Sequence, residues 1–290
     1  MKVGFIGLGN MGKPMALNLL AAGHQVKGFD TAAINAEGIP IATSATDAAS
    51  EIDILITMLP NGTILQAVAE MVLPVMPKDA VLLDCSTVDV DSARLVASIS
   101  EANNIIPLDA PVSGGVGGAM AGTLTFMVGG PKIGFEKATP LFKIMGQKAV
   151  LCGPSGNGQV AKICNNMILG ATMIVTCEAF AMADKLGLER QSMFDVVSTS
   201  SGYSWSMNAY CPAPGIGPSA PSDNNYTPGF DSELMVKDLR LSQHAAEMID
   251  ADTPMGKLAL ELYEQFVFEE NGKGRDFSAM LPRFEKRSRS

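Results

Sequence analysis

The chain has 290 residues, of which 47% are hydrophobic and 18% charged, and this composition is typical of a compact protein rather than a disordered one. Lys and Arg number 21 against 30 Asp and Glu, so the net charge of -9 disfavours binding to the phosphate backbone of nucleic acid. The basic tail of Lys286, Arg287 and Arg289 is too short to offset this charge.

Short β-branched runs alternate with helical patterns from Met1 to about Gly153, which is the rhythm of a doubly wound parallel sheet. Stretches such as Asn61–Val72 and Asp89–Ala102 repeat apolar residues at helical spacing. The predicted strands are Val3–Ile6, Gln25–Asp30, Asp53–Leu59, Ala80–Ser86, Ile105–Pro111, Thr123–Gly129 and Lys148–Cys152.

Beyond Gly158 the pattern becomes helical. Residues Gln159–Leu186 contain no proline and predict one long helix of about 40 Å at 1.5 Å per residue. Later helices are predicted over Asp231–Ile249, Thr253–Phe268 and Asp276–Lys286, and the Pro- and Gly-rich stretch Cys211–Gly229 is a loop, either functional or a plain surface excursion. We therefore expect a Rossmann-type α/β domain over residues 1–161 and an all-α domain over 162–290, joined by the long helix.

The cysteines and the apolar segments bear on location. The five cysteines are odd in number and form no CxxC pair, so we expect reduced thiols in a cytoplasm and no metal site. No signal-peptide core is present, and the apolar stretch Ile168–Ala183 is shorter than a bilayer requires, so a buried helix is expected there rather than a membrane span.

The first predicted strand runs directly into a glycine-rich turn and a helix. A lone GxGxxG is a weak signal, but here strand, turn, helix, second strand and a terminal acid fall within thirty residues, as in a dinucleotide-binding unit. The first glycine would allow the tight turn, the second the approach of a pyrophosphate, and the third close packing of helix on strand. The turn consists of Gly7, Leu8, Gly9, Asn10, Met11 and Gly12.

Asp30 ends the second predicted strand, where a carboxylate can accept hydrogen bonds from the ribose hydroxyls of NAD. The same charge would repel the 2′-phosphate of NADP by about 4 kcal/mol at ~4 Å. Thr31, Ala32 and Ala33 supply no arginine to compensate. The sequence therefore favours NAD, unless Asp30 is an ordinary turn residue.

Two further segments carry candidate chemistry. The small residues of Asp109–Gly115 follow a strand, and their N–H groups either surround an anion such as a carboxylate or form a flexible hairpin entry. In Gly156–Asn166, Lys162 and Asn166 share one helical face, although any solvated helix can carry such a pair.

With these motifs the chain resembles the β-hydroxyacid dehydrogenase family over essentially its full length, and within it the 3-hydroxyisobutyrate dehydrogenase subgroup. The resemblance rests on GFIGLGNMGKPMA (4–16), DAPVSGGVGGAMAG (109–122), GNGQVAKICNN (156–166) and MVKDL (235–239). It departs at Tyr203-Ser204 and at the acidic Asp231–Glu233, and both departures bear on the fine substrate preference.

The resemblance implies a role for each matching residue. Lys162 matches the catalytic lysine and Asn166 a neighbour that holds the substrate. Trp205 and Tyr210 either line the pocket or are core aromatics. The resemblance further assigns the substrate carboxylate to Ser113, Gly114 and Gly115, and the cofactor to Leu59, Pro60, Thr87 and Lys237.

The expected reaction is NAD-dependent oxidation of 3-hydroxyisobutyrate to methylmalonate semialdehyde, a step of valine breakdown, by a homodimer or homotetramer without a metal. Lys162 would take the hydroxyl proton, with its pKa lowered by burial or by Lys237, because His24 and His244 fall in predicted surface positions. The alternatives are reduction of tartronate or succinate semialdehyde, and a cofactor-binding module without turnover, which the presence of Lys162 disfavours.

Overall fold

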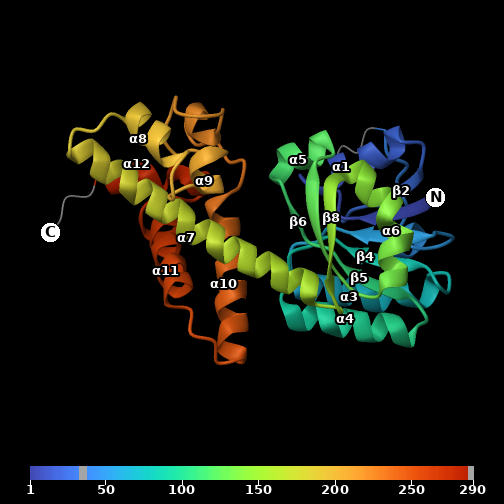
Figure 1. Cartoon of the computed structure of the whole chain (residues 1–290). Helices are drawn as coiled ribbons and strands as arrows, with labels where there is room; N and C mark the ends of the chain where they lie inside the picture. Colours follow the sequence, from blue (N-terminus) through green and yellow to red (C-terminus); the bar gives the residue numbers. More distant parts are fainter. Residues whose placement is uncertain (33–37, 287–290) are drawn as a thin grey trace. The chain divides into compact units, whose positions relative to one another are not determined.

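The computed structural model describes residues 1–32 and 38–286, so Ala33, Arg287 and Arg289 lie outside the described residues. The chain folds into two compact units, Met1–Lys162 and Ile163–Ser290. Figure 1 shows a layered α/β unit and a helical unit, with the long helix α7 (Asn157–Lys185) belonging to both.

The first unit is built on a mostly parallel sheet in the order β2-β1-β3-β4-β5-β7-β6, with β8 pairing β7. The first five strands pair in parallel, whereas β7 runs antiparallel to β5 and β6. The order reverses beside β1, and in such sheets ligands bind at the carboxyl ends of the strands at this switch point. The strands are β1 (Lys2–Ile6), β2 (Gln25–Phe29), β3 (Ile54–Thr57), β4 (Val81–Asp84), β5 (Ile106–Asp109), β6 (Val112–Ser113), β7 (Leu124–Gly129) and β8 (Gly146–Gly153).

Helices cover both faces of the sheet (Figure 1). On one face, Met15 and Leu141 pack with Phe5; on the other, Leu65 and Ala69 pack in a separate core with the buried strand residues there. This double layer confirms the predicted fold class. The helices are α1 (Gly12–Ala21), α2 (Ala45–Ala48), α3 (Gly62–Val72), α4 (Val90–Ala102), α5 (Gly115–Ala121) and α6 (Lys132–Met145).

The second unit is helical, as predicted. Phe180 of α7, Leu239 of α10 and Tyr263 of α11 are fully buried in its core. Its further helices are α8 (Arg190–Val197), α9 (Trp205–Asn208), α10 (Ser232–Met248), α11 (Pro254–Glu269), the 3-10 turns η2 (Pro221–Asn224) and η3 (Phe277–Ala279), and α12 (Met280–Lys286).

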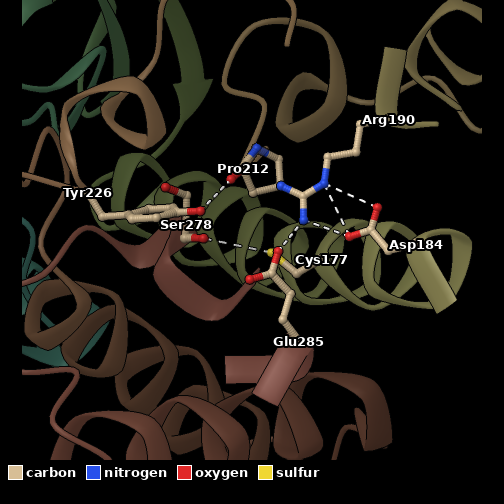
Figure 2. Close-up of polar contacts among 7 residues, drawn as sticks. All are labelled: Cys177, Asp184, Arg190, Pro212, Tyr226, Ser278 and Glu285. Atoms are coloured by element: carbon tan, nitrogen blue, oxygen red, sulfur yellow. Dashed lines mark hydrogen bonds and ion pairs between the residues drawn. The ribbon is translucent and has the colours of Figure 1, made fainter. Parts of the chain in front are cut away.

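Polar contacts fix α7 to segments far along the chain (Figure 2). Arg190 donates from Nε and Nη2 to the carboxylate of Asp184 near the end of α7, and also pairs with Glu285 of α12.

In the Cys211–Gly229 loop, the Tyr226 hydroxyl donates to the carbonyl of Pro212 at 2.8 Å, and Tyr226 is buried. Tyr226 thus ties the loop to itself and packs in the core of the second unit.

The helix α7 is both long and apolar. At 29 residues it is, among the described residues, the one helix long and apolar enough to cross a membrane by length and composition. The expectation of a short stretch concerned Ile168–Ala183 alone, and the helix that contains it begins at Asn157, close to the predicted start at Gln159. Half of its most apolar window is buried inside the fold.

Candidate active site

The glycine turn after β1 has two crowded positions and one open one. Gly7 has a φ of 94°, and a Cβ there would lie 2.2 Å from the Met58 carbonyl oxygen. A Cβ on Gly12 would lie 1.9 Å from the Gly7 carbonyl oxygen, whereas one on Gly9 would meet nothing within 4 Å. Packing thus requires the first and last glycines, and open space at the middle one fits the close approach of a pyrophosphate.

The Asp30 carboxylate lies beside this turn, directly after β2. One oxygen accepts the N–H of Leu8 at 2.7 Å, and the other accepts the N–H of Ala32 at 2.8 Å. Each carboxylate oxygen has a further lone pair that can accept a ribose hydroxyl. Together with the open Gly9, this geometry fits NAD.

A buried carboxylate holds the segments after β3 and β4. Asp84 Oδ1 accepts from the Thr57 hydroxyl at 2.7 Å and from the Ser86 hydroxyl at 2.6 Å. The Ser86 Oγ in turn accepts the N–H of Leu59 at 2.7 Å. This network, which the sequence did not reveal, positions Leu59, one of the predicted cofactor residues.

Burial raises the pKa of Asp84 to about 7, and its Oδ2 has no hydrogen-bond partner. Because the folded pKa lies above the unfolded value of 3.8, the protonated Asp84 makes its full contribution to the free energy of unfolding below pH 4. This contribution is lost as the pH rises to 7. Asp84→Asn stays neutral, so relative to wild type it should gain about 2–3 kcal/mol of unfolding free energy between pH 5 and pH 8. Denaturant titrations at both pH values measure this. Asp53→Asn, at an exposed carboxylate that accepts the Lys2 N–H, is the control, and an Asp84 difference that does not change with pH would contradict the assignment.

The first turn of α7 is fixed by Asp109 at the end of β5. Asp109 Oδ1 accepts the N–H of Gly156 at 2.7 Å, and Oδ2 accepts the N–H of Gln159 at 3.0 Å. Burial raises the pKa of Asp109, while these N–H donors oppose that shift. Lys162 follows one turn later and is only 7% exposed. A lysine this buried is unlike the solvated lysines of a surface helix.

Asn166, one further turn along α7, lies in the second unit and has a charged partner within that unit. Its Nδ2 donates to Asp238 Oδ2 at 2.5 Å, and both residues are buried. Lys237 forms an ion pair with Asp238 Oδ1 at 3.4 Å. The structure thus brings Asn166 and Lys237 together through Asp238, which was not predicted as a site residue, although it stands inside the MVKDL motif.

The two candidate aromatic residues stack on each other, with ring centroids 4.8 Å apart. The Tyr210 hydroxyl donates to Asp276 Oδ2 at 2.8 Å, and the same oxygen accepts the N–H groups of Gly229 and Phe230. Burial raises the pKa of Tyr210. Tyr210 is therefore an anchor of the loop, whereas Trp205 keeps 51% of its surface exposed.

The small-residue segment after β5 is ordered rather than a loose hairpin. Ser113 lies in β6 and pairs with Thr125 of β7. Gly114 and Gly115 have φ of 129° and 60° and lead into α5, a short helix that the sequence did not predict. Both conformations favour glycine.

The histidines and cysteines were the remaining candidates for proton transfer and metal binding. His244 is exposed on α10, and His24 contacts the N-terminal amine. Within residues 1–32 and 38–286, no three His, Cys, Asp or Glu side chains form a potential metal site. The five cysteines carry no disulfide: Cys85, Cys152, Cys164, Cys177 and Cys211.

Comparison with known proteins identifies the family. Residues 2–153 match the family model described as the NAD binding domain of 6-phosphogluconate dehydrogenase, and residues 156–284 match the one described as NAD-binding of NADP-dependent 3-hydroxyisobutyrate dehydrogenase. The 3-hydroxyisobutyrate dehydrogenase of Pseudomonas aeruginosa is 43% identical over 96% of both chains. The NAD-dependent L-serine dehydrogenase of the same organism is 42% identical over 98% of both chains.

A solved structure is also similar. The Mycobacterium tuberculosis 3-hydroxyisobutyrate dehydrogenase with L-serine has a TM-score of 0.92 and 42% identity, covering 97% of this chain and 98% of that chain. Both family models concern NAD-binding domains, and together they span nearly the whole chain. The chain belongs to the 3-hydroxyisobutyrate dehydrogenase family of NAD-dependent hydroxyacid dehydrogenases.

Proposed function

We propose that this protein oxidises 3-hydroxyisobutyrate to methylmalonate semialdehyde with NAD, in valine breakdown, and that Lys162 is the general base. The observation that carries the proposal is the buried Lys162, one helical turn from an Asn166 that Asp238 holds in place. Bound NAD supplies the hydride acceptor. The Lys162 Nζ takes the hydroxyl proton as the carbinol C–H bond breaks, and it returns that proton in the reducing direction.

The other candidate residues bind and orient. In the proposal, Asn166 and the Ser113–Gly115 segment hold the substrate, the latter at its carboxylate, and Trp205 and Tyr210 line the pocket. The cofactor is held by the glycine turn, Asp30, and a further set consisting of Leu59, Pro60, Thr87 and Lys237. The first 161 residues thus bind NAD, and residues 162–290 contribute to the substrate site and to self-association.

L-serine is a second candidate substrate, because one similar enzyme is named for it and one similar structure contains it. L-serine and 3-hydroxyisobutyrate share a primary alcohol and a carboxylate. On the carbon between them, L-serine carries an ammonium group and 3-hydroxyisobutyrate a methyl group. A methyl group favours an apolar contact, whereas an ammonium requires hydrogen-bond acceptors or a carboxylate. Reduction of tartronate semialdehyde or succinate semialdehyde is a weaker alternative to the proposed reaction.

A substrate panel tests the proposal. NADH formation at 340 nm with 3-hydroxyisobutyrate, L-serine and 2-methylpropan-1-ol, which lacks the carboxylate, should rank the simple alcohol last by about 10²- to 10⁴-fold in kcat/KM. The reason is that binding of the simple alcohol would take water from the donors around Ser113 and leave them unpaired, at about 1–3 kcal/mol each. The methyl ester of 3-hydroxyisobutyrate is the matched control for size. Similar kcat/KM for the acid and the simple alcohol would refute a carboxylate site, and absence of NADH with every acid would refute the proposed reaction.

Self-association and location complete the proposal. Ile168, Val175 and Met182 recur every seven residues on α7 and are 61%, 55% and 61% exposed, which leaves an apolar stripe on the second unit. Such a stripe is typical of an association surface and supports a homodimer or homotetramer. Light scattering gives the mass, and a monomer would contradict the proposed self-association.

The unpaired cysteines support a reducing compartment, which we propose is the cytoplasm.

A further inference from the structure

Gln159, in the first turn of α7, is fully buried and uses both ends of its side-chain amide. Its Oε1 accepts the N–H of Val88 at 3.1 Å, and its Nε2 donates to the carbonyl of Ser86 at 2.8 Å. These two backbone groups flank Thr87, one of the proposed cofactor residues. A single side chain therefore holds the backbone on both sides of Thr87.

The main chain of Gln159 is held as firmly as its side chain. Its N–H donates to Asp109 Oδ2 at 3.0 Å, and the N–H of Gly156 donates to the other oxygen of that carboxylate. Gly158 is enclosed too, because a Cβ there would lie 2.4 Å from the carbonyl oxygens of both Asp109 and Met127. The first turn of α7 consequently has little freedom to shift relative to the sheet.

Lys162 stands three residues after Gln159, on a neighbouring position of the same helical face. A displacement of the first turn would be transmitted to Lys162, because the intervening helix is rigid. All of these residues lie in the first compact unit. Hydride and proton transfer are steeply sensitive to alignment, and an error of about 1 Å costs about 10²-fold in rate.

We propose that Gln159 is a positioning residue that fixes Thr87 of the cofactor segment and Lys162 relative to each other. The inference rests on the proposed function, since it takes Thr87 as a cofactor residue and Lys162 as the base. Gln159 itself touches neither the substrate nor the reacting atoms in this role; it acts through the backbone on both sides.

The test begins with Gln159→Met, which keeps the side-chain length and removes both hydrogen bonds. We expect kcat to fall about 10- to 100-fold, NAD affinity measured by calorimetry to change less than about threefold, and the deuterium isotope effect on kcat with carbinol-deuterated substrate to rise. The isotope effect rises because misalignment slows the chemical step and not product release. The matched control is Gln66→Met: Gln66 of α3 donates to the Ser92 hydroxyl at 2.8 Å in the same unit, and its loss should alter none of these values.

Gln159→Glu provides a second measurement if the Met variant folds poorly. A protonated glutamic acid can reproduce both hydrogen bonds, whereas the ionised form cannot donate to the Ser86 carbonyl. The activity of this variant relative to wild type should therefore rise as the pH falls from 8 to 6, although Asp84 and Asp109 lie in the same network. A flat ratio, or a loss of NAD affinity equal to the loss of kcat, would overturn the positioning role.

Failure of the proposed function can be recognised separately. If Lys162→Ala retains full activity, the base is misassigned while the Gln159 variants still report on alignment. If the wild-type protein oxidises no β-hydroxy acid, hydrogen exchange decides: Gln159→Met should lose protection at the Val88 amide and at the amides of the first turn of α7. Unchanged exchange at both places would overturn the inference.

Discussion

Lys162→Ala is expected to lower kcat by about 10²- to 10⁴-fold, which is the usual contribution of a positioned general base, while NAD affinity changes little. Lys162 is 7% exposed and lies one turn after the Asp109-capped start of α7, so its ammonium or amine has a defined place. The glycine turn and Asp30 bind elsewhere in the first unit and keep their contacts in the variant. Calorimetry with NAD and steady-state kinetics with 3-hydroxyisobutyrate separate the two effects.

Lys162→Arg distinguishes proton transfer from charge. A guanidinium, with a pKa above ~12, cannot release its proton near neutral pH, so the arginine variant should be nearly as slow as the alanine variant. Lys185→Ala, at the exposed end of the same helix, is the control and should leave kcat unchanged. An arginine variant with most of the wild-type activity would mean that Lys162 supplies only charge, and Lys237 would then be the next residue to test.

Local signals in the sequence were sufficient for the frame of the fold. Strands such as Ile54–Thr57 and Val81–Asp84 are buried at every position and stand out as short apolar runs. The helices α3 and α4 begin after Asn61 and Asp89, whose side chains accept from Ile64 N and Ser92 N, so their starts carry the residues that cap helices. Periodicity and caps act within a few residues, and a single sequence therefore reports them.

Features that depend on distant partners could not be predicted in the same way. Asp84 and Asp109 read as strand-end acids, and only the fold shows that each is buried, one with Thr57 and Ser86 and the other with the start of α7. Asp238 likewise accepts a hydrogen bond from Asn166, which lies 72 positions earlier in the sequence. The short helix α5 was missed because its glycines have a low helix propensity, which packing overrides.

The cofactor preference gives the second large expected effect. Asp30→Ser combined with Thr31→Arg should raise the ratio of kcat/KM for NADP to that for NAD by about 10²- to 10³-fold, since a repulsion of about 4 kcal/mol is replaced by an attraction for the 2′-phosphate. The absolute kcat/KM with NAD should fall as well, because Asp30 also accepts the N–H groups of Leu8 and Ala32. Asp30→Asn separates these contributions: it removes the charge and keeps one amide oxygen as an acceptor, so it should lose discrimination while retaining more of the NAD activity. Asp53→Ser is the matched control, because that carboxylate also accepts a backbone N–H of β1, from Lys2 at the opposite end of the strand, and its loss should leave the ratio unchanged. A wild-type enzyme that already uses NADP as well as NAD would show that Asp30 does not face the ribose, and its role would then be limited to holding the glycine turn through Leu8.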